Sequence, residues 1–478
     1  MSLSASLAAA ATGLTAAARG AETVSSNIAS AQTPGYAPRS LALTARGTGP
    51  GVAVDGTLRT VDAILLGDRR RAEAAESAAA TRAAAWQRID SALGAPGDAG
   101  SIAGRIAAFE ASLITATATP ESAPSLDRVR AAASTLAAGL RDATASVQSA
   151  RAAADAAIAQ DVGQLNRTLG SIAALNTQIT RGLAAGRDVA GLMDQRQALV
   201  DGIAAIVPLR ESTRAGGQIA LHAESGFALL DGRPTTIGFV PAATMSAAMT
   251  REDGALARLT LDGVPVVAPD AGPLGGGRLG ANFAIRDSEA TAAQAALDAI
   301  ARDLVARFAD PATDPTLPAG AQGLFVDALA PGPAGTAGRI ELNPALRSES
   351  GETLWRLRDG LGAAAPGSAG SAAQLSRLLD ALATARPTEA PGIGAARRDS
   401  LSLAADVAAS ISARRLRAED DASFAVSLAE GMRAGAAAAG VDSDAELQAL
   451  MRLERAYAAN ARVIATVDRM LGELLEIR

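Results

Sequence analysis

The sequence predicts an elongated, mainly α, multi-domain protein that carries an inserted β-rich unit and pairs its N- and C-terminal helices as a coiled coil. Three observations lead to this fold class. The chain has 478 residues, too many for one ordinary core. Its apolar share of 49% is largely Ala, with only 2% aromatic residues, which favours helices packed closely through small side chains. Apolar residues follow a heptad spacing at both ends of the chain, whereas a stretch in the middle alternates.

The first segment predicts a helix with a single apolar seam. The seam residues follow one another at steps of four and three: Leu3, Leu7, Ala10, Leu14, Ala17, Ala21, Val24 and Ile28. The opposite face is Ser, Thr and Ala with only Arg19 and Glu22 charged, so this helix needs partners on several sides. Pro34 and Gly35 end it, and Tyr36, one of two tyrosines, is expected to anchor the turn.

The last segment predicts a second helix of the same design. "SDAE" (Ser443 to Glu446) has the form of a capping box, which places the start of the helix at Ser443. Its seam again alternates by three and four: Leu450, Leu453, Tyr457, Asn460, Ile464, Val467, Leu471 and Leu474. Asn460 is strongly polar for a seam position. It either selects the register of the pair or faces solvent at the edge of the seam.

The regions between the two ends are helical with one interruption. Helical periodicity is expected over 69–92, 99–118, 126–184, 192–207, 281–309, 371–385 and 399–439. From Val207 to about Pro269, short apolar runs alternate around Gly-centred turns, and "GRIELN" predicts one further strand. The predicted domains are a terminal coiled-coil assembly domain (1–36 and 441–478), a helical rod (37–206 and 271–440) and an inserted β-rich domain (207–270).

Composition and charge argue against several classes of partner. A net charge of -6 and a pI near 5.2 disfavour nucleic-acid binding, and "GDRRRAE" (67–73) is best explained as a solvated helix face. No window offers some 20 apolar residues free of charge, so no membrane insertion is expected. The first thirty residues lack the pattern of a cleaved secretory signal, and without Cys no disulfide can form.

The sequence also contains no convincing catalytic constellation. "GGGRLG" (275–280) has the G-x-G-x-x-G spacing but lacks the preceding strand of a dinucleotide site, so we expect a turn into a helix. His222 is the single histidine, which leaves no usual metal set or nucleophile–base pair. Asp194 and Asp201 share an amphipathic helix, where solvent-facing charge is the ordinary interpretation. We therefore expect no enzyme activity, no cofactor and no catalytic, cofactor-binding or metal-binding residues.

Both ends of the chain resemble one family. "SSNIASAQTPGYAPR" (25–39) resembles the N-terminal signature of the axial flagellar proteins, which include rod, hook and hook-associated proteins. The matching positions are Ser26, Asn27, Ile28, Ala29, Ala31, Thr33, Pro34, Gly35 and Tyr36, while Ser30 stands where the family usually has Asn. The last segment resembles the matching C-terminal signature through Ala456, Tyr457, Ala459, Asn460, Ala461, Arg462 and Val463. "SDAE" replaces the acidic pair usual in that family.

Finer features favour one branch of the family. "GLMDQRQALVDGIAAIV" and "GGGRLGANFAIRD" are similar to segments of the hook-associated members at the hook–filament junction, although "RFADPATDP" lacks the Asn and His usual there. A hook or rod subunit is the alternative within the family. A cytoplasmic coiled-coil scaffold and a nucleotide-using enzyme are alternatives of other classes, and neither explains both terminal motifs.

The resemblance implies a structural subunit of the bacterial flagellum that forms the hook–filament junction. It implies self-association into a ring, contact with hook protein on one side and with other hook-associated or filament proteins on the other, and an export chaperone. It also implies an extracellular location, reached through the flagellar type III pathway without a cleaved signal, and terminal segments that fold only on assembly. The assembly residues expected at the N-terminal end are Leu3, Leu7, Leu14, Val24, Asn27, Ile28, Pro34, Gly35 and Tyr36. At the C-terminal end they are Leu450, Leu453, Tyr457, Asn460, Arg462, Ile464, Val467, Leu471 and Leu474.

Overall fold

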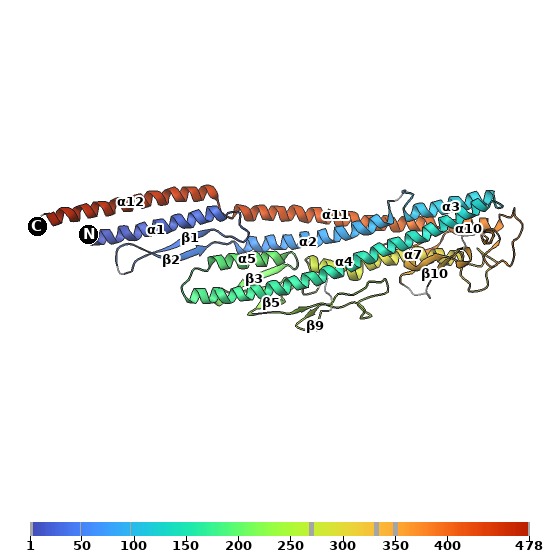
Figure 1. Ribbon diagram of the computed structural model, residues 1–478, viewed down its shortest axis with the longest axis horizontal. Coiled ribbons are helices and arrows are strands. Elements are labelled where there is room, and N and C mark those ends of the chain that lie inside the picture. The colour runs from blue at the N-terminus through green and yellow to red at the C-terminus, as the bar shows by residue number, and fades with distance from the viewer. Residues whose placement is uncertain are drawn as a thin grey trace.

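The computed structural model is a long, narrow, mainly helical body with both chain ends at the same end of the molecule (Figure 1). It describes residues 3–47, 49–95, 97–266, 272–328, 334–347 and 352–476. Helices run along its length, and the strands form small antiparallel sheets. The predicted fold class, mainly α with an inserted β-rich unit, is confirmed.

Helices account for most of the described chain. They are α1 (Leu3–Ser30), α2 (Ala63–Leu93), α3 (Ile102–Ala118), α4 (Ala123–Ala184), α5 (Ala190–Ala204), α6 (Arg278–Ala284), α7 (Ala290–Phe308), α8 (Thr336–Arg339), α9 (Trp355–Asp359), α10 (Ala373–Ala383), α11 (Ser400–Ala438) and α12 (Ser443–Glu476). A π-helical turn, Ile285–Glu289, joins α6 to α7, and short 3-10 turns lie at Ala215–Gly217 and Pro344–Leu346.

The strands form two small sheets and three hairpins. They are β1 (Arg39–Ala45), β2 (Val52–Arg59), β3 (Leu209–Thr213), β4 (Ile219–Ala223), β5 (Ala228–Asp231), β6 (Arg233–Pro234), β7 (Ile237–Gly238), β8 (Thr260–Leu261), β9 (Val264–Pro265), β10 (Phe325–Asp327), β11 (Ile340–Leu342), β12 (Arg386–Ala390) and β13 (Ile393–Arg398). The sheets have the orders β3-β4-β5-β6 and β7-β8-β9, and β1–β2, β10–β11 and β12–β13 pair as hairpins. The proposed domain boundaries at 36, 206, 270 and 440 stay predictions.

The 62-residue helix α4 is the spine of the body and contributes to two separate hydrophobic cores. Ser122 begins it, because its side chain accepts a hydrogen bond from the Ser125 amide at the free end of the helix. Its first half packs against a core centred on Phe109, Phe308 and Phe325, whose ring centroids lie 5.4 to 5.9 Å apart. Its second half packs against α5 and the sheet that begins at β3.

Buried charged side chains fasten the β-rich insertion to α4. Arg286, on the π-helical turn, is fully buried and donates to Asp155 at 2.8 Å and to Asp287 at 2.7 Å. Burial lowers the pKa of Arg286, but these hydrogen bonds outweigh it and the net pKa is raised. Arg151, whose pKa burial lowers, donates to the carbonyls of Ser246 and Met249 in the long loop between β7 and β8.

Two hairpins lie in stretches for which the sequence predicted no strands. β1 and β2 follow the turn after α1 and contact that helix, and the Val52 amide donates to the Thr12 hydroxyl at 3.3 Å. β12 and β13 connect α10 to α11. Each is a two-stranded ribbon, which is marginal by itself, so neighbouring helices and not local strand preference determine it.

Candidate assembly site

The two terminal helices lie antiparallel and side by side (Figure 1), and glycines allow them to approach closely. A Cβ atom added to Gly20 would lie 2.9 Å from Leu453 Cδ2. A Cβ atom added to Gly13 would lie 2.9 Å from the amide atoms of Asn460. Real Cβ atoms do not approach so closely, so each glycine leaves space that a side chain of α12 fills.

A third contact fixes the same register. Asn27 Nδ2 donates to Glu446 Oε1 at 2.7 Å. On α1 the three contacting positions are 13, 20 and 27, and on α12 they are 460, 453 and 446. Steps of seven residues on both helices keep one face of each turned to the other, as in a heptad seam. The coiled-coil geometry of the pair and the register role of Asn460 stay predictions, but Asn460 does face α1.

The predicted assembly residues differ in their burial within the single chain. At the N-terminal end Val24 and Asn27 are buried, Leu3, Leu14, Ile28, Gly35 and Tyr36 are half-buried, and Leu7 and Pro34 are exposed. On α12 Val467 is buried, Leu450, Leu453, Asn460 and Ile464 are half-buried, and Tyr457, Arg462, Leu471 and Leu474 are exposed. Tyr457, 45% exposed, therefore does not fill the seam against α1 within this chain.

Asn27 is the centre of the polar contacts where the terminal helices meet the body. It is fully buried. Its Nδ2 group donates to the Arg39 carbonyl at 2.8 Å and to Glu446, and its Oδ1 atom accepts from the Tyr36 hydroxyl at 2.7 Å and the Arg39 amide at 3.1 Å. A side-chain amide has two N–H donors and two acceptor sites, so every one of them is used. Asn27 thus joins α1, the turn after it, β1 and α12.

The predicted capping box at the start of α12 is wrong. Asp442, one residue earlier, caps the helix, because its carboxylate accepts from the amides of Asp444 at 3.0 Å and Ala445 at 3.1 Å. The Glu446 carboxylate, which a capping box would turn back to the helix start, instead accepts from Asn27. The helix does begin at Ser443.

The turn that ends α1 packs on α5. Gly35 has φ +79°, and a Cβ atom there would lie 2.6 Å from the Asp194 carbonyl oxygen. Both the backbone conformation and the close approach therefore require glycine. Tyr36 lies under the Arg39 guanidinium, whose central carbon is 4.8 Å from the ring centroid.

The expectation that Asp194 faces solvent is wrong. Asp194 is 9% exposed and accepts from the guanidinium groups of Arg39 and Arg59, the latter at 2.7 Å. Arg59 also donates to Gln197 and to the Gly35 carbonyl. Arg39 is the first residue of β1 and Arg59 is the last residue of β2, and the register pairs them at the open end of the hairpin. One carboxylate on α5 therefore binds both strands at that end.

A second ion-pair cluster corrects the interpretation of "GDRRRAE" as a solvated face. Arg70 is 2% exposed and donates to Asp201 at 2.6 Å and to Glu211 at 2.9 Å. Arg69 also donates to Asp201 at 2.6 Å, whereas Arg71 is exposed and pairs with Asp68 on its own helix. The cluster joins α2, α5 and β3, next to the contacts that Asp194 makes.

Sequence reasoning missed Arg39, Arg59 and Gln197 as parts of this site. The contacts join the two arginines of the hairpin to Asp194 and Gln197 of α5, more than 130 residues away in the sequence. The single local signal was that Arg39 is the last residue of the stretch "SSNIASAQTPGYAPR" that carries the N-terminal resemblance. The other segment involved, "LMDQRQ", was singled out for its resemblance and not for its charges.

Three further observations concern nucleotide binding, metal binding and membrane insertion. Gly277 caps the start of α6 against the Ile206 carbonyl, to which an added Cβ atom would come within 2.3 Å, so "GGGRLG" forms a close-packed turn into a helix. No group of three metal-binding side chains lies together within the described ranges. Nor does any helix in those ranges have the length and apolar character to cross a membrane.

Comparisons with known proteins identify two matched parts of the chain. Residues 86–313 match the family described as flagellar hook-associated protein FlgK helical domain, and residues 436–477 match the flagellar basal body rod FlgEFG protein C-terminal family. The second match covers all of α12.

Two curated relatives and one solved structure show the extent of the similarity. Flagellar hook-associated protein 1 of Salmonella typhimurium is 29% identical over 230 residues, 46% of this chain and 41% of that protein. The Escherichia coli K12 protein of the same name is 29% identical over 230 residues, 46% of this chain and 42% of its own length. The flagellar hook junction protein FlgK from Burkholderia pseudomallei aligns with a TM-score of 0.45 and 22% identity over 54% of this chain and 46% of that chain. The matched part thus spans about two fifths of the curated relatives.

Both matched families and both curated relatives are flagellar proteins, so the matched segments are those of axial flagellar proteins. The matches support a FlgK-type protein, because the longer of them is to the FlgK helical domain and the curated relatives are flagellar hook-associated protein 1. That family is one of structural components of the flagellum.

Proposed function

We propose that this chain is a structural subunit of the hook–filament junction that assembles through α1 and α12, and that it catalyses no reaction. One observation carries the assembly part of the proposal. The fully buried Asn27 binds Tyr36 and Arg39 of the N-terminal segment and Glu446 of the C-terminal helix. The two segments that resemble flagellar signatures therefore meet at one residue, which also ties them to the body.

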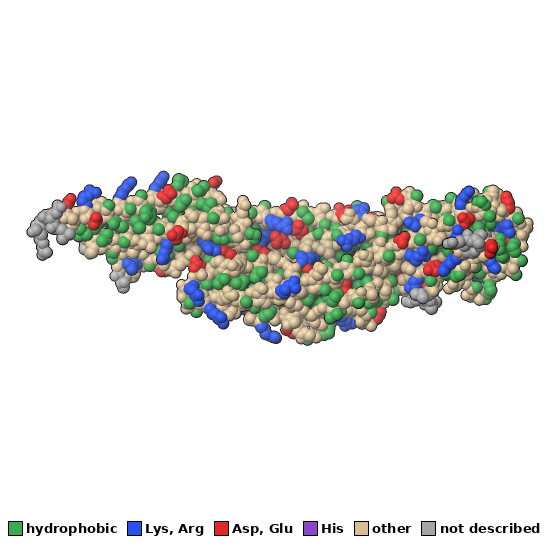
Figure 2. All heavy atoms as spheres, in the orientation of Figure 1, with side chains coloured by type: hydrophobic (Ala, Val, Ile, Leu, Met, Phe, Trp, Pro, Cys, Tyr) green, Lys and Arg blue, Asp and Glu red, His purple; other side chains and the backbone are tan. Residues whose placement is uncertain are grey.

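Exposed apolar side chains on α12 support assembly with further copies, and Figure 2 shows apolar side chains on the surface of the terminal helices. Large apolar side chains are exposed along it: Leu447, Met451, Tyr457, Val463, Met470, Leu471 and Leu474. Burying such a side chain contributes roughly 1.5–3 kcal/mol, so neighbouring subunits can offset the entropy cost of ordering the helix. We infer that the terminal segments are disordered in the free subunit and fold on joining the assembly.

The proposed partners follow from a place between hook and filament. The chain self-associates into a ring, contacts hook protein on one side, and contacts other hook-associated or filament proteins on the other. An export chaperone accompanies it before secretion. The flagellar type III pathway carries it out of the cell without a cleaved signal, and it resides in the extracellular flagellum.

Electron microscopy of cells that lack this chain tests the proposal. We expect hooks without filaments and filament protein shed into the medium, with filaments restored by the full chain. Cells without hooks would favour a rod or hook subunit. Normal filaments in the absence of the chain would contradict any junction role, and failure to secrete the chain through the flagellar pathway would favour a cytoplasmic scaffold.

A further inference from the structure

The C-terminal end of α12 extends beyond α1. In the register that sets Asn460 against Gly13, the first described helical residue of α1, Leu3, falls opposite Met470. The helix continues to Glu476, and Figure 1 shows its end beyond that of α1. Residues 469–474 are called the tip here; 469 and 470 lie opposite the first described residues of α1, and 471–474 have no α1 partner within the described part of the chain.

The tip combines apolar and charged side chains. Met470, Leu471 and Leu474 are exposed, the last by 56%. Arg469 and Glu473 are exposed as well, and neither makes an ion pair among the described residues. Residues three or four apart share a helix face, so the tip presents leucines beside one cation and one anion.

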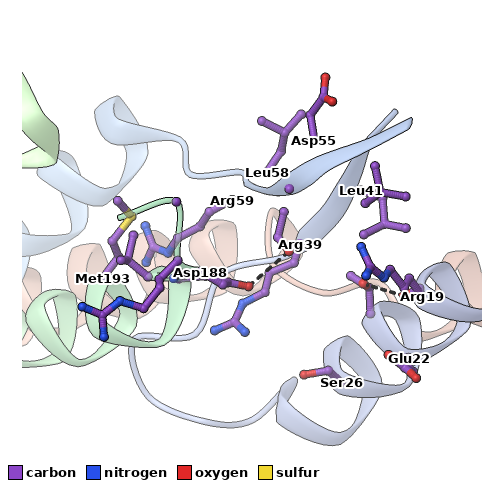
Figure 3. Close-up of a pocket in the computed structure, with 18 of the residues that line it drawn as sticks. Arg19, Glu22, Ser26, Arg39, Leu41, Asp55, Leu58, Arg59, Asp188 and Met193 are labelled. Carbon is purple, nitrogen blue, oxygen red and sulfur yellow. Dashed lines mark hydrogen bonds between the residues drawn. The ribbon is translucent and has the colours of Figure 1, made fainter. Parts of the chain in front are cut away.

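A cleft with matching character lies at the other end of the terminal helix pair. Its volume is about 960 Å³, and it is enclosed by α1, the β1–β2 hairpin and the turn between α4 and α5 (Figure 3). Leu58 and Leu183 line it and are 57% and 43% exposed. These leucines offer an apolar surface that nothing in the described chain covers.

Charged side chains of both signs surround this cleft. Arg19 and Glu22 come from α1, Asp55 from the hairpin and Arg187 from the turn before α5. All four are exposed, and within the described ranges none of them forms an ion pair. With Asp188, a further exposed carboxylate in its lining, the cleft thus offers charges of both signs around exposed leucines, the complement of a helix end with leucines and one charge of each sign.

We propose that the cleft of one copy receives the tip of α12 from a second copy displaced along the long axis. The proposal rests on the proposed function and names the surface through which the subunits meet. Leu471 and Leu474 cover Leu58 and Leu183, while Arg469 and Glu473 pair with charges of the rim. Because tip and cleft lie at opposite ends of the helix pair, the contact is head-to-tail and repeats from copy to copy.

Site-directed cross-linking tests the contact, since the chain contains no cysteine of its own. Leu474→Cys and Leu58→Cys are combined in one chain, expressed in cells lacking the wild-type chain, and oxidised in isolated flagella. We expect the monomer band to be replaced by dimers and higher multimers. The matched control combines Leu474→Cys with Ile114→Cys, an exposed position on α3 at the far end of the body, and should stay monomeric.

If Leu474→Cys prevents assembly, an exchange of charges provides a second test of the same contact. Arg187→Glu should reduce the amount of this chain in isolated flagella, and Glu473→Arg in the same chain should restore it. Flagella that carry filaments but show neither cross-link nor rescue would overturn the tip–cleft contact and leave the junction role standing. Filaments on cells lacking the chain altogether would instead overturn the junction role.

Discussion

Replacing Asn27 by Ala should loosen the connection between the terminal helices and the body. The substitution removes four hydrogen bonds, three to neutral partners and one to the Glu446 carboxylate. Each neutral hydrogen bond contributes roughly 1 kcal/mol to stability and the charged one about 2 kcal/mol. Water can reach the half-buried Tyr36 and Glu446 groups once Asn27 is gone and recovers part of this loss, so the net loss of stability is about 3 kcal/mol.

Hydrogen exchange on the full chain measures this cost locally. A loss of about 3 kcal/mol corresponds to roughly hundredfold faster exchange of amides that open with the site, here those of β1 and the first turns of α12. Ser25→Ala, an exposed change on the same helix, is the control and should leave exchange unchanged. Glu446→Gln retains an acceptor and should have a small effect. Asn27→Ala behaving like Ser25→Ala would refute the reasoning.

Three further substitutions test neighbouring parts of the account. Gly35→Ala should lower the free energy of unfolding by about 1–3 kcal/mol in thermal or urea unfolding because of the positive φ at this position alone. The control Gly170→Ala, at an exposed position of α4, should not destabilise the protein. Equal stabilities of the two variants would contradict the packing of the Gly35 turn on α5. Asp194→Ala leaves two largely buried arginines unpaired and should lower unfolding stability by about 3 kcal/mol; an unchanged melting curve would show that solvent already compensates them. Asn460→Leu should give a stable protein with impaired assembly and motility, and unchanged motility would mean that Asn460 does not select the register.

The sequence predicted those features that depend on local periodicity. The heptad seam placed Leu453 and Asn460 on the face of α12 that meets α1, because a repeat of seven keeps one face aligned over many turns. The alternation after Val207 likewise revealed the β-rich insertion. Both signals are contained in a short window of sequence.

The polar contacts of the site could not be predicted, because they depend on segments far apart in the chain. Nothing near Asp194 indicates that two arginines from the hairpin reach it, so solvent exposure was the natural expectation. "SDAE" has the spacing of a capping box, but Asp442 competes for the same amides and Asn27 offers Glu446 a buried partner. The tertiary hydrogen bond from Asn27 therefore replaces the local contact that the motif predicted for Glu446.

The assembly role of the terminal segments is tested most directly by a chain that lacks residues 1–36, expressed in cells without the full chain. We predict that its body keeps its helical circular dichroism and cooperative unfolding, because both hydrophobic cores lie outside that segment. We also predict that it fails to enter the flagellum, so that hooks stay without filaments in electron micrographs. Filament growth supported by the truncated chain would contradict the account.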